Sequence, residues 1–90
     1  MRITWNERKR MSVLGERGVD FIDASGVFDG PVLVDEDVRK DYGERRYIAI
    51  GRAEKGHFVV VFTRRDDALH IITAWRAGRD ARRRYEELFA

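Results

Sequence analysis

The sequence of 90 residues lacks cysteine, has a single proline and contains no long apolar run. Without cysteine, the chain can form no disulfide, thiol nucleophile or cysteine metal site. No stretch approaches the roughly 18 apolar residues of a membrane span, and the opening segment RITWNERKRM lacks the apolar region of a signal peptide. We therefore expect a cytoplasmic protein that has no membrane partner and forms one domain over residues 1–90.

Charge is abundant but unevenly placed. The net charge is only +2, yet residues 20–44 hold eight acids and two basic side chains, whereas residues 64–84 hold seven arginines and three acids. Arginine outnumbers lysine fifteen to three, and its planar guanidinium binds phosphate through two hydrogen bonds. This asymmetry indicates an anionic partner for the C-terminal part.

The N-terminal third predicts two helices. Asn6 can cap a first helix over about Glu7–Arg17, which Gly18 would end. Asp20 can cap a second, in which apolar residues recur at helical spacing as far as Phe28.

The rest of the chain predicts strands and a final helix. Strand patterns cover VLV at 32–34 and the segments 45–53, 57–64 and 69–76, with connections short enough for an antiparallel meander. The segment 79–89 predicts a helix whose apolar stripe is Ala81, Tyr85, Leu88 and Phe89. We therefore predict an α+β fold of two N-terminal helices, a four-stranded antiparallel sheet and a C-terminal helix, with the helices covering one sheet face fully and the other in part.

Metal and histidine chemistry receive little support. The acidic run DEDVRKD at 35–41 lacks the glycine and the terminal glutamate of a calcium loop, so we expect no metal and no cofactor. His57 follows a turn and is expected to be exposed. His70 is interpreted as a half-buried structural residue, with a role as general acid or base as the alternative. Gly51, inside a strand, marks a bulge or close packing.

Three arginines surround the junction between the last strand and the final helix. Arg52 lies near the end of a central strand, Arg76 ends the last strand, and Arg79 begins the helix. Guanidiniums that converge beside a helix N-terminus would form a phosphate site. Such a cluster can stabilise the charge that develops during RNA cleavage, in which the 2′-hydroxyl is an internal nucleophile. Glu7, Lys9, His70 and Tyr85 remain open as proton carriers.

Several short segments occur in a fixed order along the chain: WNERK at 5–9, GVDF at 18–21, DYGERRYIAIGR at 41–52, VVVFT at 59–63, and IITAWRA with RRRYEE downstream. In these segments and in their order, the sequence resembles the BrnT toxins of bacterial type II toxin–antitoxin systems. The resemblance implies a RelE-like compact fold and a metal-independent endoribonuclease that inhibits translation. It also implies a cognate ribbon-helix-helix antitoxin, through which the toxin would reach operator DNA indirectly.

Two sets of candidate residues follow from the matching positions and from the basic cluster. The catalytic candidates are Glu7, Lys9, Arg52, Arg76 and Arg79. The RNA-binding candidates are Trp5, His70, Arg82, Arg83 and Tyr85. The sequence departs from the family habit at Trp75 and at His70, which leaves one alternative: a non-catalytic module that binds RNA or a partner through the same basic face.

Overall fold

The structure, a computed structural model, describes residues 1–89. The first third contains strand β1 (Arg2–Trp5), helix α1 (Glu7–Arg17), the short helix α2 (Phe21–Ala24) and the 3-10 helix η1 (Ser25–Asp29). The remaining two thirds contain strands β2 (Val32–Glu36), β3 (Tyr47–Ala53), β4 (Gly56–Arg65) and β5 (Ala68–Arg76), followed by helix α3 (Arg79–Phe89). No helix in the described part is both long enough and apolar enough to cross a membrane.

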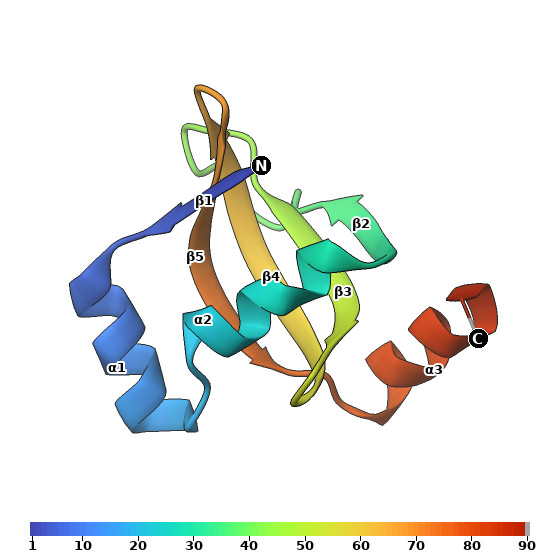
Figure 1. Ribbon diagram of the computed structural model, residues 1–90. Helices are drawn as coiled ribbons and strands as arrows, with labels where there is room; N and C mark the ends of the chain where they lie inside the picture. The colour runs from blue at the N-terminus through green and yellow to red at the C-terminus, as the bar shows by residue number, and fades with distance from the viewer. Residues whose placement is uncertain (90) are drawn as a thin grey trace.

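The five strands form one mixed sheet in the order β1-β5-β4-β3-β2 (Figure 1). The prediction of a four-stranded antiparallel sheet after two N-terminal helices is therefore wrong. β1 precedes the helices and pairs in parallel with β5, from Arg2 opposite Ala68 to Trp5 opposite Ile71. A four-residue strand is too short for its alternation to be recognised in the sequence, and because its partner is distant in the chain, no hairpin turn marks the pairing.

The helix starts follow the predicted caps. The Asn6 side chain accepts a hydrogen bond from the Lys9 backbone N–H at 3.0 Å, and α1 ends at Gly18, whose φ of 68° is left-handed. The Asp20 side chain accepts one from the Ile22 backbone N–H at 2.9 Å, so α2 begins where predicted. The second helix is shorter than expected, because after Ala24 the chain continues as the 3-10 helix η1.

Close packing explains Gly51 in β3. A side chain there would place its Cβ 2.7 Å from the Cβ of Val27 in η1, which is too short for two carbon atoms. The glycine therefore lets η1 lie directly on the sheet.

The helices divide between the two faces of the sheet. Those of the N-terminal third pack on one face, in a core that includes Phe21, Val27 and Phe58. α3 covers part of the other through Tyr85, which is only 7% exposed and packs with Ile50 and Val59. Figure 1 shows α1 and α3 on different sides of the sheet.

The last turn of α3 corrects the predicted apolar stripe. Leu88 is 61% exposed and Phe89 is 42% exposed, so the expectation that both point inward is wrong. The Phe89 ring lies against the Tyr85 ring, with centroids 5.0 Å apart, and Tyr85 itself makes the contact with the sheet.

Candidate functional site

The hairpin between β3 and β4 brings basic side chains to one end of the sheet. Its two-residue turn pairs Arg52 with His57, and Phe58 lies opposite Arg76 on β5. Because successive residues of a strand point to opposite faces, Arg52 and His57 share the face that α3 covers, and Arg76 starts from the other face.

Arg76 folds against the hairpin turn. Its Nη1 donates a hydrogen bond to the Lys55 carbonyl oxygen at 3.0 Å, and its guanidinium carbon lies 5.2 Å from the centroid of the Phe58 ring. Gly56 leaves room for this contact, since a Cβ there would come within 3.0 Å of Arg76 Nη1. The guanidinium is therefore held at the tip of the hairpin.

His57 is enclosed by α3. Its ring packs edge-on against Tyr85, with centroids 5.6 Å apart, and its Nε2 lies 3.8 Å from Glu86 Oε1, which forms an ion pair when the imidazole is protonated. The side chain is 14% exposed. The expectation that His57 is exposed at a turn is wrong, because it considered the strand without the helix that packs over it.

Three adjoining cavities surround this end of the sheet. The first, of about 370 Å³, is lined by Gly30, Pro31, Arg52, His57, Tyr85, Glu86 and Phe89. The second, of about 270 Å³, is lined by Gly56, His57, Arg76, Ala77 and Arg82. The third, of about 240 Å³, is lined by Arg79, Arg82, Arg83 and Glu86. We call the surface around these cavities the basic end.

Shared residues connect the three cavities into one surface. His57 joins the first to the second, Arg82 joins the second to the third, and Glu86 joins the first to the third. Arg52, Arg76 and Arg79 thus lie on the same end of the molecule, but each lines a different cavity. The structure does not bring them to a single point.

Several arginines of the basic end lack a carboxylate partner. Within residues 1–89, no ion pair involves Arg52, Arg79, Arg82 or Arg83. Arg84, by contrast, reaches back to Asp35 on β2 at 3.2 Å. The unpaired guanidiniums keep their hydrogen-bond donors available for a phosphate.

Tyr85 has a clear role in holding α3. Its hydroxyl donates a hydrogen bond to the Pro31 carbonyl oxygen at 2.9 Å, and its ring is buried against the sheet. The phenol proton is therefore committed within the fold, and the residue positions the helix that carries the neighbouring arginines.

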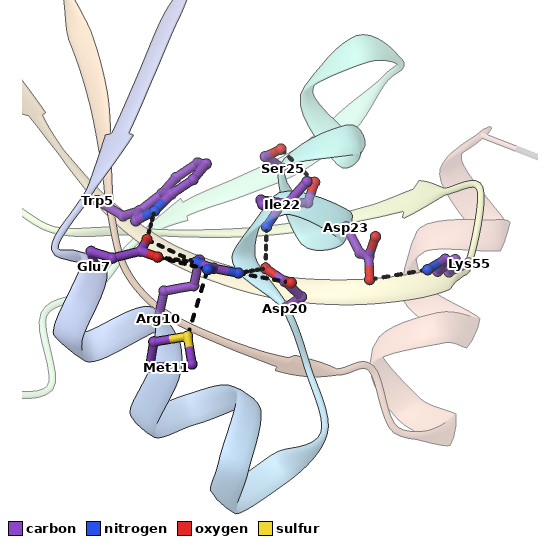
Figure 2. A network of polar contacts seen from close by, with 9 residues as sticks. All are labelled: Trp5, Glu7, Arg10, Met11, Asp20, Ile22, Asp23, Ser25 and Lys55. Atoms are coloured by element: carbon purple, nitrogen blue, oxygen red, sulfur yellow. Dashed lines mark hydrogen bonds and ion pairs between the residues drawn. The ribbon is translucent and has the colours of Figure 1, made fainter.

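The predicted residues of the N-terminal motif belong to another network, which Figure 2 shows. Trp5 Nε1 donates to Glu7 Oε1 at 3.0 Å, and Arg10 bridges Glu7 and Asp20 with bonds of 2.8 and 2.9 Å. The hydrogen bond from Arg10 is the main reason that the pKa of Glu7 falls to about 2. A carboxylate with so low a pKa is a poor proton acceptor at neutral pH.

This network lies apart from the basic end. α1 packs on the sheet face opposite α3, so Trp5, Glu7 and the exposed Lys9 do not join the cavities described above. A different contact, 3.4 Å between Asp23 and Lys55, ties α2 to the β3–β4 turn (Figure 2).

His70 also lies away from the basic end. It faces Thr63 near the far end of β4, and its Nδ1 is 3.0 Å from Thr4 Oγ1 on β1. Burial, together with the nearby positive charge of Arg65, lowers the pKa of His70. The predicted half-buried position is confirmed, and the hydrogen bond across the β1–β5 pair gives it a structural role.

The acidic run at 35–41 is organised around Asp37. This carboxylate is 5% exposed and binds the Arg39 guanidinium at 2.8 Å and the Tyr42 hydroxyl at 3.1 Å. The hydrogen bonds from Arg39 lower the pKa of Asp37. Across residues 1–89, no group of three histidine or acidic side chains is arranged to hold a metal ion.

Comparison with known proteins agrees with the motifs of the chain. The family described as "Ribonuclease toxin, BrnT, of type II toxin-antitoxin system" matches residues 5–83. The crystal structure of the Brucella abortus ribonuclease toxin BrnT is similar, with a TM-score of 0.63 and 26% sequence identity over 88% of this chain and 99% of that one. A comparison with curated proteins finds no match. The chain belongs to the BrnT family of ribonuclease toxins of type II toxin–antitoxin systems.

Proposed function

We propose that this ribonuclease toxin cleaves RNA at the basic end and needs no metal ion to do so. One observation carries the proposal: Arg52, Arg79 and Arg82 have no carboxylate partner in the described chain and line three adjoining cavities, two of which also contain His57. Such cavities offer fixed positive charge to a phosphate, and guanidiniums supply this charge without a cation.

In this proposal, three arginines contact the phosphate from different sides. Arg52 approaches from β3, Arg76 is fixed at the hairpin tip by the Lys55 carbonyl, and Arg79 opens α3. The 2′-hydroxyl attacks the phosphorus, and charge builds on the non-bridging oxygens as it does so. Hydrogen bonds that strengthen with this charge lower the barrier.

The remaining predicted residues take supporting places in this proposal. Arg82 and Arg83 extend the field along α3 towards the rest of the RNA. Trp5, Glu7 and Lys9 act through the fold of α1 or through contacts with distant nucleotides, and His70 supports the β1–β5 pair. Because its substrate is RNA, we place the toxin in the cytoplasm.

The partner is an antitoxin, as the type II system requires. We propose that it carries a ribbon-helix-helix domain, which brings the toxin to operator DNA only indirectly. An acidic segment of the antitoxin would suit the unpaired arginines by charge complementarity. An Arg79→Ala variant separates two uses of the cluster: it loses killing if Arg79 contacts RNA, and it only weakens the complex if Arg79 serves the antitoxin alone.

The test starts with the whole chain. Expression without antitoxin should stop growth and fragment cellular RNA, and the purified protein should cut RNA in the presence of EDTA. Cleavage that EDTA abolishes and a divalent ion restores would contradict the metal-independent mechanism. RNA binding that weakens steeply with salt but yields no product would instead indicate the non-catalytic alternative, since phosphate contacts dominate such salt dependence.

A further inference from the structure

We propose that His57 is the general acid of RNA cleavage, the residue that protonates the leaving 5′-oxygen. The inference rests on the proposed function of the basic end and adds a proton donor to its arginines. It follows from the position of His57 among the cavities, from the contacts that fix its ring, and from the chemistry that the arginines cannot perform.

His57 lines three of the cavities at this end of the molecule. It lines the cavity that contains Arg52, the cavity that contains Arg76 and Arg82, and a larger groove of about 850 Å³ along the β3–β4 turn. A phosphate bound by arginines of either neighbouring cavity would therefore lie next to the imidazole. A proton donor must be within hydrogen-bond reach of the atom that it protonates.

The His57 imidazole is packed on one side and remains partly accessible to solvent. Tyr85 packs against the ring, and the His57 carbonyl oxygen accepts a hydrogen bond from the Ala77 backbone N–H at 3.0 Å. The side chain remains 14% exposed, which leaves an edge for a substrate. A fixed ring with an open edge is the arrangement that proton transfer requires.

The charged and titratable groups around His57 come from both sheet faces and from the β3–β4 turn. They are Glu86, Tyr85 and Arg82 on α3, Arg52 on β3, Arg76 on β5, and, along the larger groove, Asp23, Asp29, Glu54 and Lys55. Glu86 Oε1 lies 3.8 Å from Nε2 on one side of the imidazole, and the arginines offer positive charge to a phosphate on the other sides.

The arginines cannot supply this proton, because a guanidinium stays protonated in proteins. In the proposed step the 2′-oxygen forms a bond to phosphorus and loses its proton to water. The bond from phosphorus to the 5′-oxygen breaks, and that oxygen takes the proton of the His57 imidazolium. The products are a 2′,3′-cyclic phosphate and a 5′-hydroxyl, and His57 regains a proton from solvent.

The second histidine provides a matched control. His70 is also partly buried on the sheet, but it lies near the other end of β4 and bonds to Thr4. Replacing His70 with glutamine should leave cleavage close to the wild-type rate. The same change at His57 removes proton transfer and keeps a side chain of similar reach.

The experiment uses the full chain, EDTA and an RNA oligonucleotide with one site that the wild type cuts. H57A and H57Q should cut it on the order of 10²- to 10⁴-fold more slowly than the wild type. A second oligonucleotide carries sulfur in place of the 5′-oxygen at that site. Because a thiolate leaves without a proton, both variants should cut it at nearly the wild-type rate. Urea unfolding of each variant checks that the fold is retained.

The outcomes separate this inference from the proposed function. Wild-type protein that leaves RNA intact would overturn both. Cleavage by H57Q at the wild-type rate would overturn the role of His57 and leave the basic end in place. Slow cleavage of both oligonucleotides by a folded H57Q would also overturn it, because a general acid is not needed for the sulfur substrate.

Discussion

The polar network at the start of α1 and the basic end of the sheet both contain arginine, but their arginines have different partners. Arg10 is bound on two sides, by Glu7 and by Asp20, and its side chain is 16% exposed. Arg52 and Arg79 are exposed and have no carboxylate partner within residues 1–89. In the N-terminal network, the Arg10 guanidinium binds carboxylates and so joins α1 to the start of α2. At the basic end, the guanidiniums of Arg52 and Arg79 remain able to bind an anionic ligand.

This difference separates arginines that the fold already pairs with a carboxylate from arginines that it leaves without one in residues 1–89. The total charge of a segment does not distinguish them, since both regions are rich in charged residues. The distinction depends on whether the fold already provides an anion. The variants that follow change the N-terminal network or the basic end, one at a time.

The largest effect is expected at the basic end. Arg52→Ala should lower the rate of RNA cleavage by about 10²-fold, because it removes a donor from the developing phosphate charge. The free energy of unfolding should hardly change, since Arg52 is exposed and forms no ion pair with the other described residues. Arg64→Ala is the control: Arg64 is also exposed and has no ion pair within residues 1–89, but it lies near the far end of β4. Equal loss in both variants would refute a localised site.

The next effect is expected in the N-terminal network. Asp20→Ala should reduce the free energy of unfolding by roughly 1–2 kcal/mol, because it removes the cap of α2. Asp20→Asn should cost less, since an amide oxygen can still accept the Ile22 N–H. Urea titration measures both, and cleavage by the folded variants should remain at the wild-type rate. A selective loss of cleavage would show that the network reaches the site.

A smaller effect is expected at Tyr85, which anchors α3 and lines a cavity of the basic end. Tyr85→Phe keeps the ring under α3 and removes the hydroxyl that binds the Pro31 carbonyl, at a cost of about 1 kcal/mol. Thermal unfolding should show the loss, and the cleavage rate should stay near that of the wild type. A large fall in rate without a loss of stability would instead make the phenol a participant in the reaction.

The smallest effect concerns acid stability. The pKa of Glu7 is depressed in the folded chain, so the contribution of its ion pair is present above the ordinary pKa of 4.5 and is lost as pH falls towards about 2. Glu7→Gln should therefore flatten the pH dependence of stability in this window and change the slope little above it. Urea midpoints at a series of pH values measure the slope. A wild-type slope in the variant would assign the acid sensitivity to other carboxylates.

Most helices and strands could be predicted because their signals are local. Asn6 and Gly18 mark both ends of α1, and the short turn after Ala53 marks the β3–β4 hairpin. β1 could not be predicted in the same way, because its pairing with β5 joins residues as distant as Thr4 and His70, 66 positions apart. Such a pairing depends on the whole fold and not on a nearby turn.

The candidate site was predictable only in part. The arginines were identified from composition and position, but their separate cavities depend on how α3 lies on the sheet. His57 was missed because its burial comes from Tyr85, which is 28 positions further along the chain. One signal was available: a two-residue hairpin turn after Ala53 sets Arg52 opposite His57.

The position of β5 in the sheet has a consequence for synthesis. This strand is the last to be made but lies between β1 and β4, so β1 has no partner strand, and β4 is paired only with β3, until β5 has been added. A growing chain that stops after β4 already has Arg52 and His57, but it lacks Arg76, Arg82 and the helix that encloses the imidazole. A ribosome in the middle of making this chain therefore carries only part of the basic end. The basic end is assembled only when the chain is nearly complete.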